Sequence, residues 1–203
     1  MLKLDHIVLA AETLQEGVDY VQDRLGVSLD AGGQHDLFGT HNRLLGLGDC
    51  YFEVIARNPL AKPAQRPLWF DLEHFAGPPR VITWLCQTRE MGQTLSALPY
   101  DPGQVITVTR DDLIWDLTVA EDGRLAMGGA APSLIDWKTT IPPTHRLREV
   151  GCRLKQFKVY HPQAGQLRAW ADHMLKDPRI GFETSEMPMM SLTISTPNGD
   201  ADL

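Results

Sequence analysis

This chain contains the same predicted order of elements twice. Each copy has a strand, a helix and three further strands. The first occurrence covers residues 1–57 and the second residues 68–140, and a proline-rich stretch separates them. In such a unit a helix covers one face of the strands, so the other face is free to curve around a cavity. The sequence therefore predicts the α+β class, with tandem βαβββ modules that form curved mixed sheets around a cleft.

The first module shows the pattern most clearly. Residues 4–11 are almost wholly apolar, which is typical of a buried strand. Thr13 and Glu16 have the spacing of a capping box, apolar residues follow at helical intervals, and Gly26 ends the predicted helix. The three further strands of this module are expected at residues 27–31, 39–47 and 51–57.

The second module is expected as strand 81–88, helix 89–98 and strands 104–109, 113–120 and 133–137. Residues 150–203 contain a predicted strand, a helix and two short strands. This order predicts a partial third βαββ unit packed on the same domain as the paired modules of residues 1–140.

Composition excludes several classes of function. The chain has 19 Lys and Arg against 26 Asp and Glu, a net charge of −7, and no basic run, so neither nucleic acid nor a membrane surface is an expected partner. No apolar run approaches the roughly 20 residues that cross a bilayer. The three cysteines are widely spaced in apolar stretches, which indicates buried thiols and a cytoplasmic location. The sequence has no motif for a nucleotide cofactor.

Two polar residues interrupt strands that are otherwise apolar. His6 lies in the first strand, and Glu53 lies at the centre of Tyr51-Phe52-Glu53-Val54-Ile55. A buried imidazole needs a hydrogen-bond partner or a metal, and a carboxylate in a strand either faces water or is paired. Together they favour a divalent metal site or an acid–base pair, with Glu53 as a catalytic residue.

Further candidates lie in neighbouring strands. His41 is predicted as catalytic and Asn42 as substrate-binding, although a solvated strand start explains both equally well. Asp136 is the acid in the last strand of the second module, the positional counterpart of Glu53. Trp69, Trp84 and Trp137 are expected to line a pocket for an apolar or ring-bearing ligand, with core packing as the alternative. The remaining histidines are read as surface residues, namely His35, His74, His145, His161 and His173.

Residues 4–8, 39–47, 51–55 and 134–137 resemble stretches of glyoxalase-like proteins of the vicinal oxygen chelate superfamily, and the resemblance covers residues 2–138. It implies paired modules around a cleft, with a divalent metal held by the first and last strands of each module. Carried over, it implies that His6, Glu53 and Asp136 bind manganese, iron, nickel or zinc. The counterpart of His6 in the second module is Thr83 or Trp84, which breaks the four-ligand pattern.

The expected function is a glyoxalase-like small-molecule enzyme of lyase, isomerase or dioxygenase type, which uses a divalent metal or Glu53 as a base. The resemblance also includes proteins that bind ligands without chemistry. A binding or sequestration protein of the same fold is therefore the alternative, and a homodimer is an arrangement that the sequence leaves open.

Overall fold

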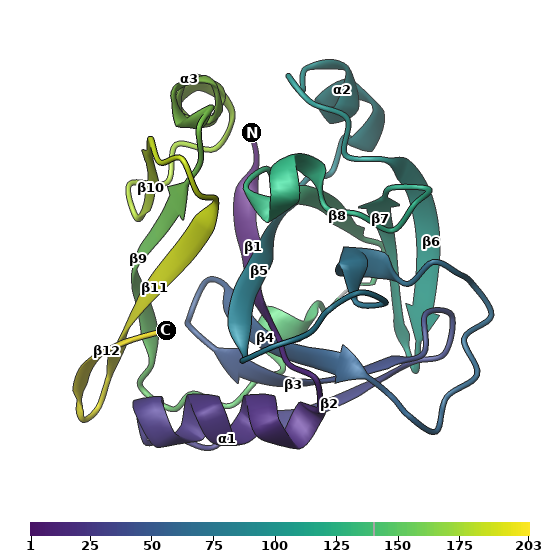
Figure 1. Ribbon diagram of the computed structural model, residues 1–203, viewed down its shortest axis with the longest axis vertical. Coiled ribbons are helices and arrows are strands. Elements are labelled where there is room, and N and C mark those ends of the chain that lie inside the picture. Colours follow the sequence, from purple (N-terminus) through teal and green to yellow (C-terminus); the bar gives the residue numbers. More distant parts are fainter. Residues whose placement is uncertain (140) are drawn as a thin grey trace.

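The computed structural model of the protein describes residues 1–139 and 141–203, so the predicted boundary at residue 140 lies outside the described residues. Eight strands form a curled sheet, and four strands form a second sheet that lies along its outer face (Figure 1). This arrangement confirms the predicted α+β class. None of the described helices is long and apolar enough to span a membrane.

The first module contains β1 (Lys3–Ala10), α1 (Leu14–Leu25), β2 (Asp30–His35), β3 (Thr40–Gly46) and β4 (Tyr51–Arg57). The Thr13 side chain accepts the Glu16 backbone N–H at 3.2 Å, and Gly26 ends α1 with φ 66°, as the sequence predicts. Strand β2 begins later than expected because Gly32 and Gly33 belong to it. They lie where its pairing with β3 shifts register.

The second module contains β5 (Arg80–Gln87), α2 (Met91–Ser96), β6 (Gln104–Arg110), β7 (Leu113–Val119) and β8 (Ser133–Trp137). The sheet order is β2-β3-β4-β1-β5-β8-β7-β6, and the modules join where β1 pairs with β5. The two edge strands β2 and β6 approach each other, so the sheet curls into an almost closed ring.

Three short 3-10 turns connect the strands: η1 (Trp69–Asp71), η2 (Ala126–Gly129) and η3 (Pro143–His145). Turn η1, in blue, lies inside the ring in Figure 1. There Leu68, Trp69 and Phe70 join a buried apolar cluster with residues of the concave sheet face. This cluster fills part of the interior and leaves a small pocket beside it.

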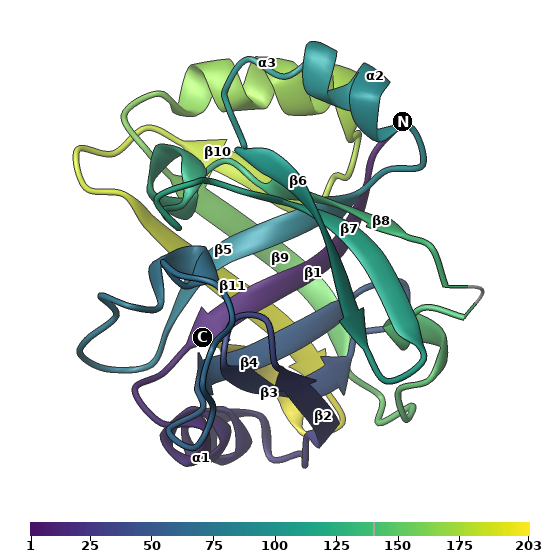
Figure 2. The same ribbon diagram turned by 90° about the vertical axis from the view of Figure 1, so that its right-hand side faces the viewer.

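The last unit contains β9 (Arg153–Tyr160), α3 (Ala164–Met174), β10 (Ile180–Glu183), β11 (Met189–Thr196) and β12 (Gly199–Asp202). Its order of elements matches the predicted partial third unit, with β12 as an additional short strand. Here β10 pairs directly with β9 in parallel, whereas in each module the strand after the helix lies at the sheet edge. The second sheet crosses behind β1 and β5 in Figure 2.

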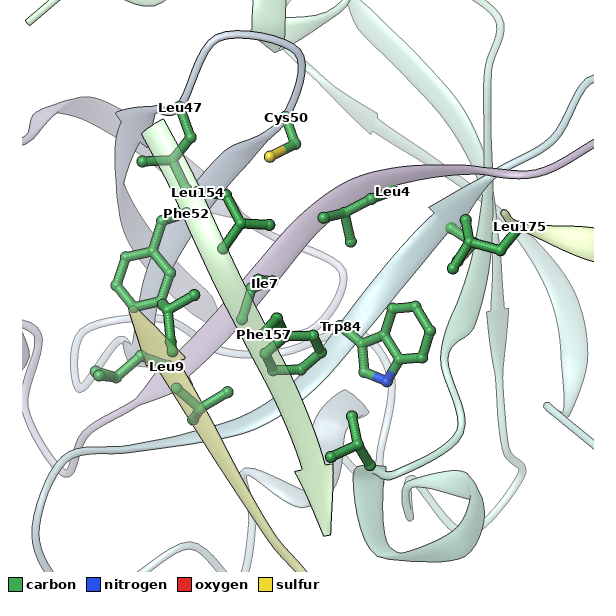
Figure 3. Close-up of a cluster of buried hydrophobic side chains, with 14 of the residues drawn as sticks. Leu4, Ile7, Leu9, Leu47, Cys50, Phe52, Trp84, Leu154, Phe157 and Leu175 are labelled. Carbon is green, nitrogen blue, oxygen red and sulfur yellow. The ribbon is translucent and has the colours of Figure 1, made fainter. Parts of the chain in front are cut away.

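The main core lies between the two sheets (Figure 3). Ile7, Phe52 and Trp84 point outward from the curled sheet and meet Leu154 and Phe157 of β9. The ring centroids of Trp84 and Phe157 are 5.7 Å apart. Because the core occupies the outer face, the concave face is left to hold polar groups.

Candidate active site

A pocket opens on the concave face where the two modules meet. Its polar lining comes from His6, His35, Asn42, Tyr51, Glu53 and Arg110, and its walls are mostly aromatic and aliphatic, including Trp69, Trp115 and Trp137. The space free of atoms is about 390 Å³, part of it open to solvent, and the surrounding side chains leave little of it unobstructed. In this conformation the pocket admits a molecule of a few heavy atoms.

A bulge in β1 builds the first half of the site. The pairing of β1 with β5 shifts register between Leu4 and His6, so the consecutive residues Asp5 and His6 are both buried, each 4% exposed. Asp5 Oδ1 lies 2.6 Å from His6 Nδ1, and Asp5 Oδ2 accepts the Trp137 indole N–H at 2.9 Å. The Tyr51 ring stacks on the imidazole with centroids 4.4 Å apart. His6 is therefore held from both sides.

Glu53 and Asn42 continue this chain of contacts. His6 Nε2 lies 3.4 Å from Glu53 Oε2, and Asn42 Nδ2 donates to Glu53 Oε1 at 2.5 Å. Asn42 Oδ1 accepts the Gly33 backbone N–H at 2.8 Å and a more distant contact from Arg110 Nη1 at 3.5 Å. These partners fix the orientation of the Asn42 carboxamide.

Arg110 and His35 line the far side of the pocket. Arg110 Nη1 donates to His35 Nε2 at 3.1 Å, so His35 carries its proton on Nδ1, which lies 3.0 Å from Thr40 Oγ1. Trp69 Nε1 donates to the same hydroxyl at 3.2 Å. A continuous polar network thus runs across the pocket from Trp137 to Trp69.

The electrostatics of the site separate its ionised groups from its neutral ones. Burial opposes the charged form of His6, but hydrogen bonds to Asp5 and Glu53 outweigh burial and raise its pKa to about 9. Burial likewise opposes ionisation of Glu53, yet the hydrogen bond and charge of His6 lower its pKa to about 2. For His35, burial lowers the pKa to about 4. At neutral pH the pocket therefore holds an imidazolium beside a carboxylate, and a neutral His35.

The donor set does not match a four-ligand metal centre. In the first module His6 lies two residues before Val8, which pairs with Glu53. In the second, Leu85 lies two residues before Gln87, which pairs with Ile135. The counterparts of His6 and Glu53 are therefore Leu85 and Ile135, and neither apolar side chain binds a metal. Among the described residues, no group of three or more His, Cys, Asp or Glu side chains is arranged to hold a metal ion.

The structure brings most of the predicted residues together. His6, Asn42, Glu53, Trp69 and Trp137 all line the pocket. Three residues lie elsewhere, each because strand alternation turns it to the outer face.

Asp136 lies between the pocket residues Ile135 and Trp137, and it contacts Lys138 Nζ at 2.5 Å. Trp84 is fully buried between the sheets and donates its indole N–H to Ala130 O at 3.0 Å. His41 lines a separate outer groove with Arg43 and Arg57. A shift of one residue in aligning the modules accounts for Asp136, since the true counterpart of Glu53 is Ile135. Trp84 packs in the core, which is the alternative that the sequence leaves open for it.

The sequence does not predict three residues of the polar network, namely Asp5, His35 and Arg110. Asp5 and His6 are adjacent, and regular alternation places them on opposite faces, so only the bulge brings them together. His35 and also His161 are buried, contrary to the expectation of surface positions. Arg110 ends an exposed edge strand, and nothing in the sequence around it indicates a role in the site. The pair Gly32-Gly33 is the one usable signal, because glycines let other side chains approach the backbone closely, as Asn42 and Arg110 do here.

Two mixed modules around a concave polar pocket define a glyoxalase-like fold. The sequence profile of the glyoxalase-like domain family matches residues 4–175, so the chain belongs to that family, within the vicinal oxygen chelate superfamily. No curated protein matches the chain.

Several solved structures are similar to this chain at low sequence identity. A hypothetical protein from Staphylococcus aureus is 17% identical, with a TM-score of 0.65, and the match covers 93% of this chain and 88% of that one. Methylmalonyl-CoA epimerase from Mycobacterium tuberculosis is 14% identical, with a TM-score of 0.45, over 68% of this chain and 87% of that one. A hypothetical protein from Bacillus halodurans is 14% identical, with a TM-score of 0.44, over 67% and 93%.

Proposed function

We propose that the protein is an enzyme that moves a proton to or from carbon in a small molecule, the first step of isomerase and lyase reactions of the enolate type. The observation that carries this proposal is the buried chain Asp5–His6–Glu53, which ends in a carboxylate at the pocket wall. Such a chain places a base and a proton donor side by side without further groups.

In the proposed reaction Glu53 takes the proton from a carbon next to a carbonyl group. The electron pair left on carbon becomes an enolate, and His6 Nε2–H donates a hydrogen bond to its oxygen. Asp5 holds the imidazole in its protonated form and fixes its direction. Transfer of the proton from Glu53 to a different atom of the enolate gives an isomer, whereas loss of a neighbouring group gives a lyase product.

The low pKa of Glu53 has a local cause that the substrate removes. Glu53 Oε2 is 3.4 Å from His6 Nε2, longer than most charge-assisted hydrogen bonds, so this contact is easily exchanged. When a substrate oxygen takes the place of Glu53 Oε2 as acceptor of the His6 Nε2–H, Glu53 loses that partner and its pKa rises. Binding therefore strengthens the base where it is needed.

Exchange of carbon-bound hydrogen in deuterium oxide tests this proposal. The protein is incubated with a panel of small 2-oxo, 3-oxo and 2-substituted acids and their amides, and exchange is followed by proton NMR. We expect exchange at one position of at least one compound, a loss of 100-fold or more in Glu53→Gln, and unchanged exchange in Asp136→Asn, which alters an acid on the outer face. Equal exchange in wild type and Glu53→Gln would contradict the assignment of the base.

The metal-dependent form of the hypothesis, which includes a dioxygenase reaction, is tested with parallel samples. These samples are treated with chelator and then resupplied with manganese, iron, nickel or zinc. In the described part of the chain, no third His, Cys, Asp or Glu side chain is arranged with His6 and Glu53 to hold a metal ion, so we expect exchange to survive chelation. Loss on chelation and recovery with one metal would favour the metal-dependent form instead.

A binding or sequestration protein is the second candidate, and the three pocket tryptophans favour it. It is distinguished by a saturable change in tryptophan fluorescence without exchange for every compound on the panel. The cytoplasmic location and the homodimer stay predictions of the sequence.

A further inference from the structure

We infer that the substrate is a small carboxylic acid whose carboxylate binds Arg110 and whose second or third carbon faces Glu53. This inference rests on the proposed function for the reacting carbon, but the carboxylate site stands on contacts of its own.

Arg110 is a cation without an acidic partner among the described residues. Its Nη1 is used by two neutral acceptors, His35 Nε2 and Asn42 Oδ1, and its Nε is buried without any acceptor in the described part of the chain. An N–H that is removed from water and left unpaired is costly, so a missing acceptor is the simplest explanation. A carboxylate is the acceptor whose geometry fits a guanidinium best.

The surroundings of Arg110 are arranged to hold it in place. Gly33 lies against the side chain, and a Cβ at that position would come within 2.6 Å of Arg110 Cδ and 2.8 Å of Nε. His35 is kept neutral by burial, with a pKa near 4, so it accepts from the guanidinium and does not repel it. Each neighbour thus favours a fixed, charged Arg110 beside the pocket.

The placement of the charges, rather than their sum, also favours an acid as the ligand, because both acids of the site contact His6 and neither contacts Arg110. The negative charges of Asp5 and Glu53 lie on either side of His6, which leaves Arg110 as the cation at the opposite wall. A monoanion bound at Arg110 is neutralised there without competing for His6. A neutral compound of the same shape offers the guanidinium an acceptor without a negative charge, so it binds less tightly.

The distance between the two ends of the site sets the size of the acid. The carboxamide of Asn42 contacts Arg110 through Oδ1 and Glu53 through Nδ2, so one amide group separates the two charges. A carboxylate on Arg110 therefore places a carbon one or two bonds away against Glu53. The small free volume agrees with an acid of about three to six non-hydrogen atoms.

A ligand can also reach Arg110 from solvent. A shallow hollow shares Leu44, Arg110 and Pro143 with the pocket. Three acids line this hollow. Asp30 pairs with Arg148 and Asp112 with Arg146, and Asp111 forms no ion pair with Arg110 among the described residues. An incoming carboxylate meets the guanidinium before it meets Glu53.

Equilibrium binding of matched probes tests the inference without requiring turnover. Pyruvate, propionate and lactate are compared with pyruvamide, propionamide and lactamide, using tryptophan fluorescence and calorimetry. We expect each carboxylate to bind about 10- to 100-fold more tightly than its amide, since a charge-assisted hydrogen-bond pair is lost with the amide. Arg110→Gln abolishes this preference, Arg110→Lys weakens it, and Arg57→Gln, which changes an exposed arginine of the outer groove, leaves it unchanged.

Thermal unfolding of each variant shows whether it is folded, and Arg110→Lys keeps the test valid if Arg110→Gln is not. Equal affinity for acid and amide, or an undiminished preference in Arg110→Gln, would overturn the inference. Glu53→Gln separates the two proposals, because it is expected to bind the carboxylates while losing hydrogen exchange. Carboxylate binding without exchange in the wild type would contradict the proposed function and leave the Arg110 site standing.

Discussion

Replacement of Glu53 by Gln is the sharpest probe of the buried charge pair. The substitution keeps the shape of the side chain but removes its charge, and both Glu53 and His6 are almost fully buried. The new amide also places its NH2 group against either Asn42 Nδ2 or His6 Nε2, each of which is itself a donor. We therefore expect a clear loss of stability rather than a neutral change.

The size of this loss of stability follows from the pKa of His6. A rise from 6.5 to about 9 corresponds to about 3 kcal/mol at about 1.4 kcal/mol per pKa unit, shared between Asp5 and Glu53. The share of Glu53 is about 1–2 kcal/mol, and one unsatisfied buried donor adds about 1–3 kcal/mol. Glu53→Gln should thus lower the free energy of unfolding by about 2–5 kcal/mol at pH 6.

The effect depends on pH with a definite sign. The pKa of His6 is raised in the folded state, so its contribution is complete below pH 6.5 and is lost as pH rises through 9. The pKa of Glu53 is lowered, so its contribution is present above 4.5 and is lost as pH falls through 2. The difference between wild type and Glu53→Gln should be largest between pH 4.5 and 6.5 and smaller at pH 10.

Urea unfolding at pH 6 and pH 10 measures both quantities, with Glu121→Gln, an exposed turn residue, as the control. A change below about 0.5 kcal/mol at pH 6, typical of a surface substitution, would refute the buried ion pair. So would a difference of the same size at both pH values.

Three further predictions concern the supports of the site. Gly33→Ala should weaken the binding of pyruvate by about tenfold, measured by calorimetry, because the new Cβ displaces Arg110; unchanged binding would show that the arginine relaxes freely. Asp5→Asn should lower the pKa of His6, measured by NMR of its ring nitrogens, and titration still near 9 would contradict the role of Asp5. Thr13→Ala should lower the free energy of unfolding by about 1 kcal/mol through loss of the helix cap, measured in urea, whereas an unchanged midpoint would assign no energy to that hydrogen bond.

Local sequence patterns were sufficient for most of the fold. The apolar strands around His6 and Glu53, and the capped helix that ends at Gly26, depend on neighbours in the chain and were predicted close to their observed bounds. Strand β2 was misplaced because Gly32 and Gly33 are typical of a turn, while here they admit Asn42 and Arg110 against the backbone.

The site itself depended on contacts that periodicity does not contain. His6 and Glu53 stood out because a polar group in an apolar strand is anomalous by itself. Arg110 is 75 residues from its partner His35, and only the curl of the sheet joins them. Asp136 was chosen by analogy between the modules, and a shift of one residue moves a side chain to the other face of a strand.

A crystal structure of the protein with bound propionate or pyruvate tests the central claim most directly. We predict the carboxylate on Arg110, with carbon 2 or carbon 3 in contact with a Glu53 oxygen and the carboxylate distant from His6 Nε2, the ring nitrogen that faces Glu53. A carboxylate bound to His6 in place of Glu53, or one held only in the outer groove beside Arg57, would contradict it.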